Sequence, residues 1–118
     1  MAKRFEDLLA WQKARSLTSS IYALTKNGAM SRDFGFRDQI QRASISMMTN
    51  IAEGLGYSNP KQFNHYLTIS RASSIELQSL LYVALDANYI TKDIFQNLYT
   101  HTEEVISITS GLQRSLKT

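Results

Sequence analysis

Few residues of this chain have the types and spacing that enzymatic chemistry needs. His101 and Glu104 lie three residues apart, like the Glu-x-x-His pairs of di-iron bundles, but their order is reversed and no second pair accompanies them. His65 has no acidic or metal-binding partner at helical spacing, and Gly54-Leu55-Gly56 lacks the third glycine and the Lys-Ser/Thr of a phosphate-binding loop. The absence of cysteine excludes thiol chemistry. We therefore predict that the protein is not an enzyme and has no catalytic residue, metal or cofactor.

A line of polar side chains on one predicted helix is better suited to binding. At about 100° per residue its five members fall within an arc of roughly 80° beside the apolar face; this polar line consists of Gln39, Arg42, Ser46, Asn50 and Glu53. Because other positions around the same helix are apolar too (Ile45, Met48 and Ala52), we expect the helix to be covered on more than one side.

Two interpretations of the polar line remain open. In the first, its members bond to one another and to neighbouring helices or subunits, and so fix the register of the contact. In the second, Arg42 with Gln39 and Asn50 presents hydrogen-bond donors to a phosphate-rich partner. Arg42 and Glu53 are too far apart in sequence to pair within one helix, so their partners must lie elsewhere.

The polar line lies on the second of four segments in which apolar residues recur at every third or fourth position, as in amphipathic helices. The first segment predicts a helix over residues 6–26, which stops at Asn27-Gly28. The second helix is capped by Ser31 or Asp33 and ends at Gly54 and Gly56.

Asn59-Pro60 begins a third, long helix that reaches about Asn88, and Thr91 caps a fourth that continues to the C-terminus. Short connections between the four helices favour antiparallel neighbours. The sequence therefore predicts an all-α fold, an up-and-down antiparallel four-helix bundle formed by a single domain over residues 1–118.

The third and fourth helices also carry information about packing. Ser70 and Ser74 make the third helix thin at its middle, so we expect a neighbouring backbone to approach it closely, within the bundle or across a subunit contact. The seam of the fourth helix is predicted to consist of Ile94, Leu98, His101, Val105, Ile108, Leu112 and Ser115.

The net charge of +3 is unevenly distributed along the chain. Residues 1–59 hold eight basic and five acidic residues, whereas residues 60–118 hold five of each. This basic bias permits contact with nucleic acid without establishing it. No window approaches the ~20 apolar residues of a membrane span and the N-terminus lacks an apolar signal segment, so we expect a cytoplasmic protein without membrane contact.

The second helix also carries a family motif. Gln39-Ile40-Gln41-Arg42-Ala43-Ser44-Ile45-Ser46, followed by Asn50-Ile51-Ala52-Glu53-Gly54, resembles the signature of the 23S rRNA intervening-sequence proteins, also called four-helix bundle proteins. The resemblance extends to about Ile90, through Phe5, Leu8, Trp11, Ala14, Tyr22, Phe63, Leu67, Ser74, Glu76 and Leu77. It implies a bacterial protein that forms a ring-like homopentamer and is often encoded within 23S rRNA genes, with no established role. The bundle is also similar to the accessory protein of diversity-generating retroelements, which works with a reverse transcriptase and nucleic acid.

The resemblance leads to two hypotheses about function. In the first, a non-enzymatic homo-oligomer, by resemblance a pentamer, gathers basic residues from several chains against structured RNA or DNA. Tyr57 stands where many family members carry an Arg, so we expect binding either to be weaker or to use Arg37, Arg42, Lys61 and Arg71 instead. In the second, the protein is an adaptor that docks a partner, such as a reverse-transcriptase-like protein, through apolar surface and does not touch nucleic acid itself.

Overall fold

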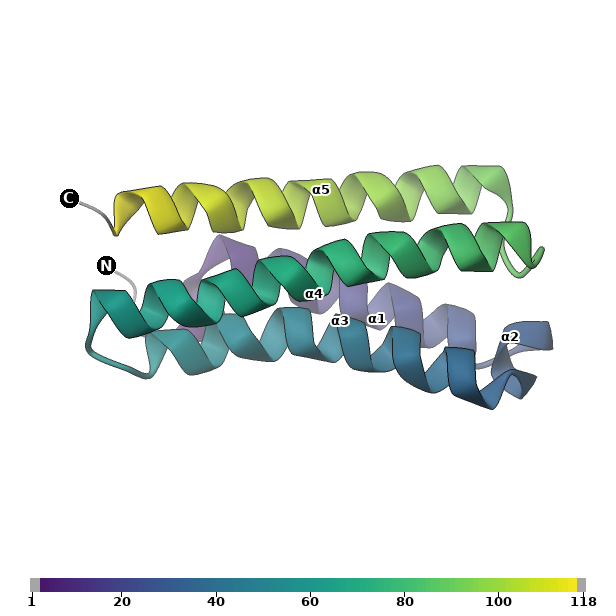
Figure 1. Cartoon of the computed structure of the whole chain (residues 1–118), viewed down its shortest axis with the longest axis horizontal. Helices are drawn as coiled ribbons and strands as arrows, with labels where there is room; N and C mark the ends of the chain where they lie inside the picture. Colours follow the sequence, from purple (N-terminus) through teal and green to yellow (C-terminus); the bar gives the residue numbers. More distant parts are fainter. Residues whose placement is uncertain (1–2, 117–118) are drawn as a thin grey trace.

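In the computed structural model, which describes residues 3–116, four long helices lie antiparallel in a bundle of 46 × 21 × 19 Å (Figure 1). The elements, in chain order, are a 3-10 turn η1 (Phe5–Asp7) and the helices α1 (Leu9–Thr25), α2 (Gly28–Arg32), α3 (Phe34–Leu55), α4 (Pro60–Asp86) and α5 (Lys92–Ser115). α1 packs against α3, α3 against α4, α4 against α5, and α5 back against α1. The predicted all-α four-helix bundle is confirmed, and the described residues contain no strand.

Three of the predicted caps are present in the structure. Asp33, Asn59 and Thr91 each accept, through a side-chain oxygen, a hydrogen bond from a backbone N–H in the first turn of α3, α4 and α5 respectively. These bonds satisfy donors that have no partner inside a helix. At the other end of α4, Asn88 adopts a left-handed conformation with φ of 61°, which ends the helix close to the predicted position.

Several boundaries differ from the prediction. α1 begins at Leu9 because Leu8 is extended after the separate turn η1. The short helix α2 was not predicted; Ser31 lies inside it and donates its hydroxyl to the Gly28 carbonyl, which leaves Asp33 as the cap of α3. Gly54 remains within α3, and the helix ends at Leu55.

The seam of α5 is rotated by about one residue from the predicted one. Leu98 and Val105 are buried as expected, but His101 is exposed and Thr102 is fully buried in its place. The other buried positions of α5 are Thr109 and Gln113, while the predicted Ile108 and Leu112 are partly buried against the core. The prediction was wrong here because it gave the seam to apolar residues, whereas α5 turns threonines and a glutamine toward its neighbours.

Small residues allow α3 and α4 to approach closely. A close approach at the middle of the third helix was predicted from Ser70 and Ser74. The Ser70 hydroxyl donates to the backbone carbonyl of Met47 at 2.6 Å, so the neighbouring backbone belongs to α3 of the same chain. Nearer the α3–α4 loop, a Cβ at Gly54 would lie 2.8 Å from both Phe63 Cδ1 and Tyr66 Cβ. Only glycine fits this second point of contact without displacing α4.

Tyr89, beyond the end of α4, ties the α4–α5 connection to the start of α3. Its hydroxyl donates to Asp33 Oδ2 at 2.6 Å, while the other carboxylate oxygen of Asp33 caps α3. This hydrogen bond is the main cause that raises the pKa of Tyr89, and loss of solvation raises it further.

We predict that Gly54→Ala destabilises the bundle by about 1–3 kcal/mol, because the added methyl forces α3 and α4 apart. Gly35→Ala is the control: it also lies in α3, but a Cβ there meets nothing within 4 Å, so we expect an unchanged or slightly raised stability. Chemical unfolding followed by circular dichroism measures both variants. Equal effects of the two substitutions would contradict a close contact at Gly54.

The bond between Tyr89 and Asp33 predicts a specific loss of stability in alkali. The raised pKa means that folding favours the neutral phenol, so this contribution is complete below the ordinary tyrosine pKa of about 10 and is lost as the pH rises through the higher folded-state pKa. Tyr89→Phe should therefore make the free energy of unfolding fall less steeply above about pH 10 than it does in the parent protein. Identical slopes for the two proteins would show that this bond does not contribute.

Candidate functional site

The polar line runs along the open edge of the contact between α3 and α4. Ser46 Oγ lies 2.7 Å from Ser73 Oγ of α4, and Asn50 Nδ2 donates to the carbonyl of Ser46 at 2.8 Å and to its hydroxyl at 3.1 Å. The side chains of Gln39, Arg42 and Glu53 are exposed, and none of them makes a hydrogen bond or ion pair with another described residue. Within one chain, only Ser46 and Asn50 of the polar line make the expected bonds to each other or to a neighbouring helix. Contacts of Gln39, Arg42 and Glu53 with further chains stay a prediction.

Arg42 lies beside an acidic residue. A cavity of about 230 Å³ is lined by Arg42 with Gln39, Ala43 and Ser46 of α3 and by Glu76 of α4. Glu76 was not part of the predicted site, because its proximity to Arg42 depends on how the two helices pair. A phosphate group brought to Arg42 would also meet the negative charge of Glu76, which weakens the attraction.

Arg37 is held in contacts within its own part of the chain. Its Nε and Nη2 both donate to Asp38 Oδ1 at 3.1 Å, and Nη1 donates to the Ser31 carbonyl at 3.1 Å. The guanidinium also lies 4.9 Å from the centre of the Phe34 ring. These contacts join α2 to the first turn of α3, so most of the donors of Arg37 are already in use.

The four predicted basic residues do not converge in one chain. Arg37 lies near the start of α3 and Lys61 near the start of α4, at opposite ends of the antiparallel pair (Figure 1). Arg42 faces the groove between α3 and α4, whereas Arg71 faces α5. Any single surface that uses all four must therefore be assembled from more than one chain.

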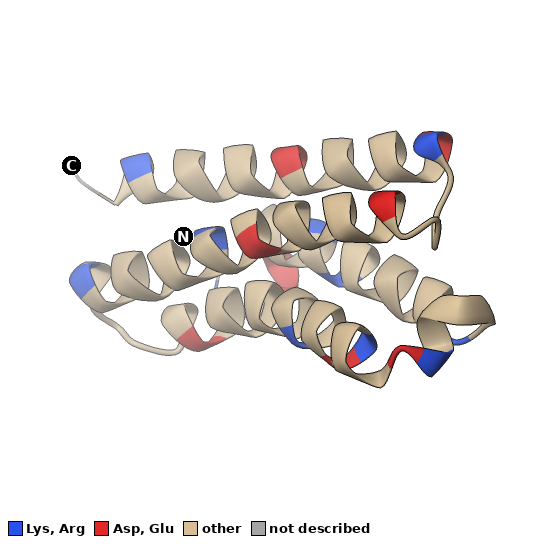
Figure 2. Ribbon diagram, turned by 45° about the vertical axis from the view of Figure 1, so that its right-hand side comes forward, with Lys and Arg blue, Asp and Glu red and all other residues tan. Residues whose placement is uncertain are grey.

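Residues 60–118 hold equal numbers of basic and acidic residues, but in the structure the two kinds lie mostly at different ends of α4 and α5. Residues 60–75 of α4 lie beside residues 105–116 of α5, and this pair of segments, the basic half, contains Lys61, Arg71 and Arg114 but no acidic residue. The other half of the same two helices carries Lys92 and five acidic residues: Glu76, Asp86, Asp93, Glu103 and Glu104. Figure 2 shows this division along α4 and α5, with only blue residues towards the C-terminal end of α5.

A buried amide organises the basic half. Gln113 is 7% exposed, and its Oε1 accepts a hydrogen bond from Arg71 Nη1 at 3.0 Å. Its Nε2 donates to Asn64 Oδ1 at 3.1 Å and to Thr68 Oγ1 at 3.0 Å. This network fixes Arg71 against α5 and lines a cavity of about 390 Å³ that also includes Ser110 and Arg114.

Gln113 and Arg114 were missed by the sequence analysis. The signal that could have found them is the spacing of Leu98, Thr102, Val105, Thr109 and Gln113, which recur at steps of four and three like a seam. This seam is hard to recognise in the sequence because three of its members are polar. The apolar residues Ile108 and Leu112, each one position before a buried residue, form a competing pattern. Arg114 then lies next to the last buried position.

Two tyrosines flank the loop between α3 and α4. The rings of Tyr57 and Tyr66 stack with centroids 5.2 Å apart, and their hydroxyls lie 3.2 Å from each other. The pKa of Tyr66 is raised, chiefly by this hydrogen bond to Tyr57. Tyr57 is 48% exposed, and the contact that its ring makes is the stacking on Tyr66.

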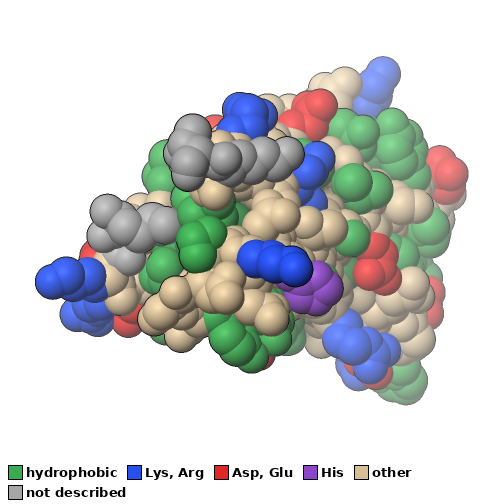
Figure 3. Space-filling model, turned by 60° about the vertical axis from the view of Figure 1, so that its left-hand side comes forward, with side chains coloured by type: hydrophobic (Ala, Val, Ile, Leu, Met, Phe, Trp, Pro, Cys, Tyr) green, Lys and Arg blue, Asp and Glu red, His purple; other side chains and the backbone are tan. Residues whose placement is uncertain are grey.

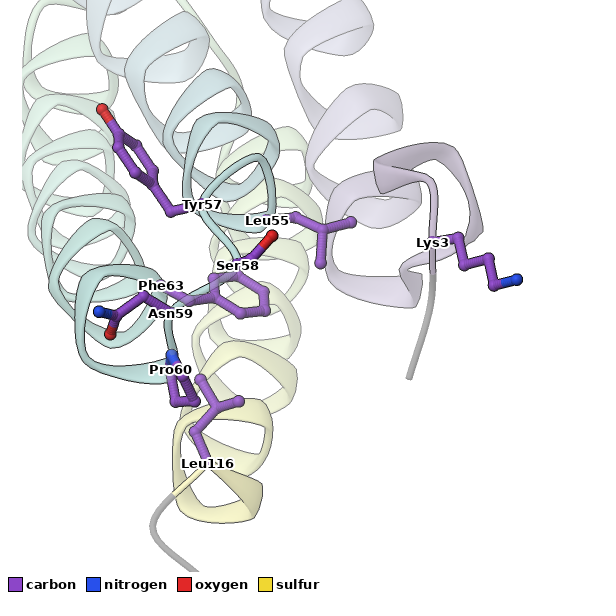
Figure 4. Close-up of a pocket in the computed structure, with 8 residues that line it drawn as sticks. All are labelled: Lys3, Leu55, Tyr57, Ser58, Asn59, Pro60, Phe63 and Leu116. Atoms are coloured by element: carbon purple, nitrogen blue, oxygen red, sulfur yellow. The ribbon is translucent and has the colours of Figure 1, made fainter.

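A cavity of about 390 Å³ lies at the same end of the bundle (Figure 4). Leu55, Phe63 and Leu116 provide its apolar wall, while Lys3 projects away from them in the view of Figure 4. In the space-filling view of Figure 3, Lys and Arg side chains are scattered among hydrophobic, uncharged and some acidic side chains. The exposed surface here is thus mixed rather than densely basic.

Residues 3–116 show neither a metal-binding cluster nor a membrane-spanning helix. No three His, Cys, Asp or Glu side chains of these residues are grouped so that they could hold a metal ion. None of the helices in the described part of the chain is long and apolar enough to cross a membrane.

Comparison with known proteins gives a family and a fold. The family model described as 23S rRNA-intervening sequence protein matches residues 6–111. A crystal structure of a protein of unknown function from the S23 ribosomal protein family of Bacteroides thetaiotaomicron is similar with a TM-score of 0.82 and 20% identity, over 93% of this chain and 100% of that one. No curated protein matches the chain.

We predict that Gln113→Leu destabilises the protein by about 2–3 kcal/mol, because the change leaves Arg71 Nη1 without its acceptor and removes the bonds to Asn64 and Thr68. Gln96→Leu is the matched control, since Gln96 is exposed on the same helix and its substitution should change stability by less than about 0.5 kcal/mol. Thermal or urea unfolding distinguishes the two. A cost at Gln113 no larger than that at Gln96 would mean that the network does not hold α4 to α5.

Proposed function

Because the chain belongs to the 23S rRNA-intervening sequence protein family, we propose that it is a non-enzymatic cytoplasmic bundle that binds structured RNA or DNA. The observation that carries this proposal is the basic half of α4 and α5, where Lys61, Arg71 and Arg114 lie on two adjacent segments without any acidic residue. Phosphate groups are attracted to such a surface, and their binding releases counterions. The proposed contact therefore lies on α4 and α5, whereas the contact predicted from the sequence also included Arg37 and Arg42 of α3.

Oligomerisation is the second part of the proposal, because three basic side chains alone give weak binding. The resemblance implies a pentamer, in which a charge of +3 per chain becomes about +15. Exposed apolar side chains support contacts between copies: Ile45 is 40% exposed, Ile75 54%, Tyr82 51% and Val83 48%. Burial of such side chains stabilises association by roughly 25 cal/mol per Å² of apolar surface removed from water.

An experiment with charge reversals tests the proposed surface. We expect Lys61→Glu with Arg114→Glu to weaken binding of a structured ribosomal RNA fragment by at least about tenfold and to reduce the magnitude of the salt slope by about two. Arg71 is left intact because its bond to Gln113 also supports the fold. Fluorescence anisotropy over a salt series, beside an unrelated DNA duplex, provides the affinities.

The matched control carries the same change of charge elsewhere. Lys26→Glu with Arg32→Glu alters two exposed residues at the opposite end of the bundle, so it should weaken binding much less. Equal losses in the two double variants would show that only net charge matters, and the assignment to α4 and α5 would be wrong. A loss confined to Arg42→Glu would move the site to the polar line.

A protein-interaction adaptor is the alternative function, and the exposed apolar residues of α3 and α4 favour it. In that case a partner, for example a reverse-transcriptase-like protein, covers these side chains and alone contacts nucleic acid. Binding through apolar surface depends little on salt, whereas phosphate contacts weaken steeply as salt increases. Absence of RNA and DNA binding at low salt would therefore favour the adaptor.

A further inference from the structure

The cavity between α4 and α5 contains two cations and no anion. Its lining consists of Asn64, Thr68, Arg71, Ser110, Gln113 and Arg114, with a volume of about 390 Å³. This is far more than the roughly 30 Å³ that one water molecule takes up in the liquid. Every lining residue is polar, and Thr68 and Arg114 are exposed, so the cavity is open to solvent and accessible to a polar ligand.

Arg71 enters this cavity with a fixed orientation. Its Nη1 donates to Gln113 Oε1, and Gln113 is in turn held through Nε2 by Asn64 and Thr68. A guanidinium fixed in this way loses little further conformational entropy when it binds a ligand. The network therefore preorganises one wall of the cavity.

Several donors in the cavity have no acceptor. Arg71 Nε is buried without a hydrogen-bond partner in the described part of the chain, and neither Arg71 nor Arg114 has an Asp or Glu within ion-pair distance there. Ser110 is half-buried, and its side-chain hydroxyl also makes no hydrogen bond with a described residue. A partly buried guanidinium without a counterion is costly, and an anion in the cavity would remove that cost.

Arg114 supplies the second positive wall. A Cβ placed on Gly111 would lie 3.5 Å from Arg114 Nη2, so the guanidinium is turned back over the preceding turn of α5, on the side of Ser110. Arg71 and Arg114 thus provide two forked groups of N–H donors from two helices. Forked donors match anions with several oxygens, and a charge of +2 matches a phosphate monoester or inorganic phosphate.

We propose that this cavity is a binding site for one phosphate-type oxyanion, held by Arg71 and Arg114 with the Ser110 hydroxyl as a further donor. The ligand is either free inorganic phosphate or a phosphate group of a nucleic acid. If the ligand is a phosphate group of a nucleic acid, the site rests on the proposed function, because it then holds the nucleic acid against the basic half. If the ligand is inorganic phosphate, the site does not depend on nucleic-acid binding.

Nuclear magnetic resonance of the whole protein tests the site with inorganic phosphate. Arg71 Nε–H is the reporter, since its burial shields it from exchange with water. Replacing chloride by phosphate at constant ionic strength should move this resonance along a saturable curve. Arg114→Gln should weaken the apparent affinity by about tenfold, as expected when one charge-assisted contact is lost.

Arg42→Gln is the matched control, because it removes the same charge from a neighbouring helix face and should leave the phosphate affinity unchanged. Arg71→Lys provides a second variant that keeps the charge but loses the fork; backbone amide shifts of Ser110 and Gly111 should then show weaker binding with helical content retained. Shifts that do not saturate, or equal affinities in Arg114→Gln and Arg42→Gln, would overturn the proposal.

A parallel titration with a short structured RNA separates the two ligand sources and the two proposals. If both phosphate and RNA move the Arg71 Nε–H resonance and compete, the cavity receives a phosphate of the nucleic acid. If inorganic phosphate moves it and the RNA does not bind the protein at all, the cavity is confirmed as an oxyanion site while the proposed function fails. If RNA binds elsewhere on the protein and neither ligand moves the resonance, the cavity proposal is overturned and the proposed function stands.

Discussion

The close approach of α3 and α4 is the constraint on which the rest of the structure depends. It exists because small residues stand where the helices meet: Gly54 leaves no side chain between α3 and the ring of Phe63, and Ser70 reaches the Met47 carbonyl at 2.6 Å. Larger residues would separate the helices and leave buried hydroxyls without acceptors. The contact fixes the rotation of α4, and that rotation decides which residues of α4 face α5 and which face solvent.

The chemistry of the surface follows from that rotation. With Ser70 and Ser73 turned toward α3, Arg71 necessarily faces α5, where Gln113 receives it. The antiparallel pairing then places the acid-free end of α5 beside the acid-free start of α4. Two segments that each carry a modest charge become one basic half, while the acidic residues gather at the other end of the same helices. The proposed anion binding therefore rests on how the packing arranges these ordinary residues.

Most of the fold could be predicted from the sequence because its signals are local. Asp33, Asn59 and Thr91 cap helices through bonds to backbone groups two or three residues away, and Pro60 acts at its own position. The predicted seam of α5 was wrong where it followed the apolar residues alone, because α5 buries Thr102 and exposes His101. Propensity does not show which of two adjacent seams faces the core, because the volume and hydrogen-bond acceptors of the neighbouring helices decide it.

The sequence by itself determined four amphipathic helices, their caps, the family signature around Arg42 and the lack of cysteine chemistry. Only the tertiary structure decided that Arg37 is held by Asp38 and Ser31, that Arg42 shares a cavity with Glu76, and that Arg71 and Arg114 line another. The physical reason is distance along the chain. A cap or a seam depends on residues within a turn or two, whereas Arg71 and Gln113 are 42 residues apart and meet only because two helices pack at one rotation and register.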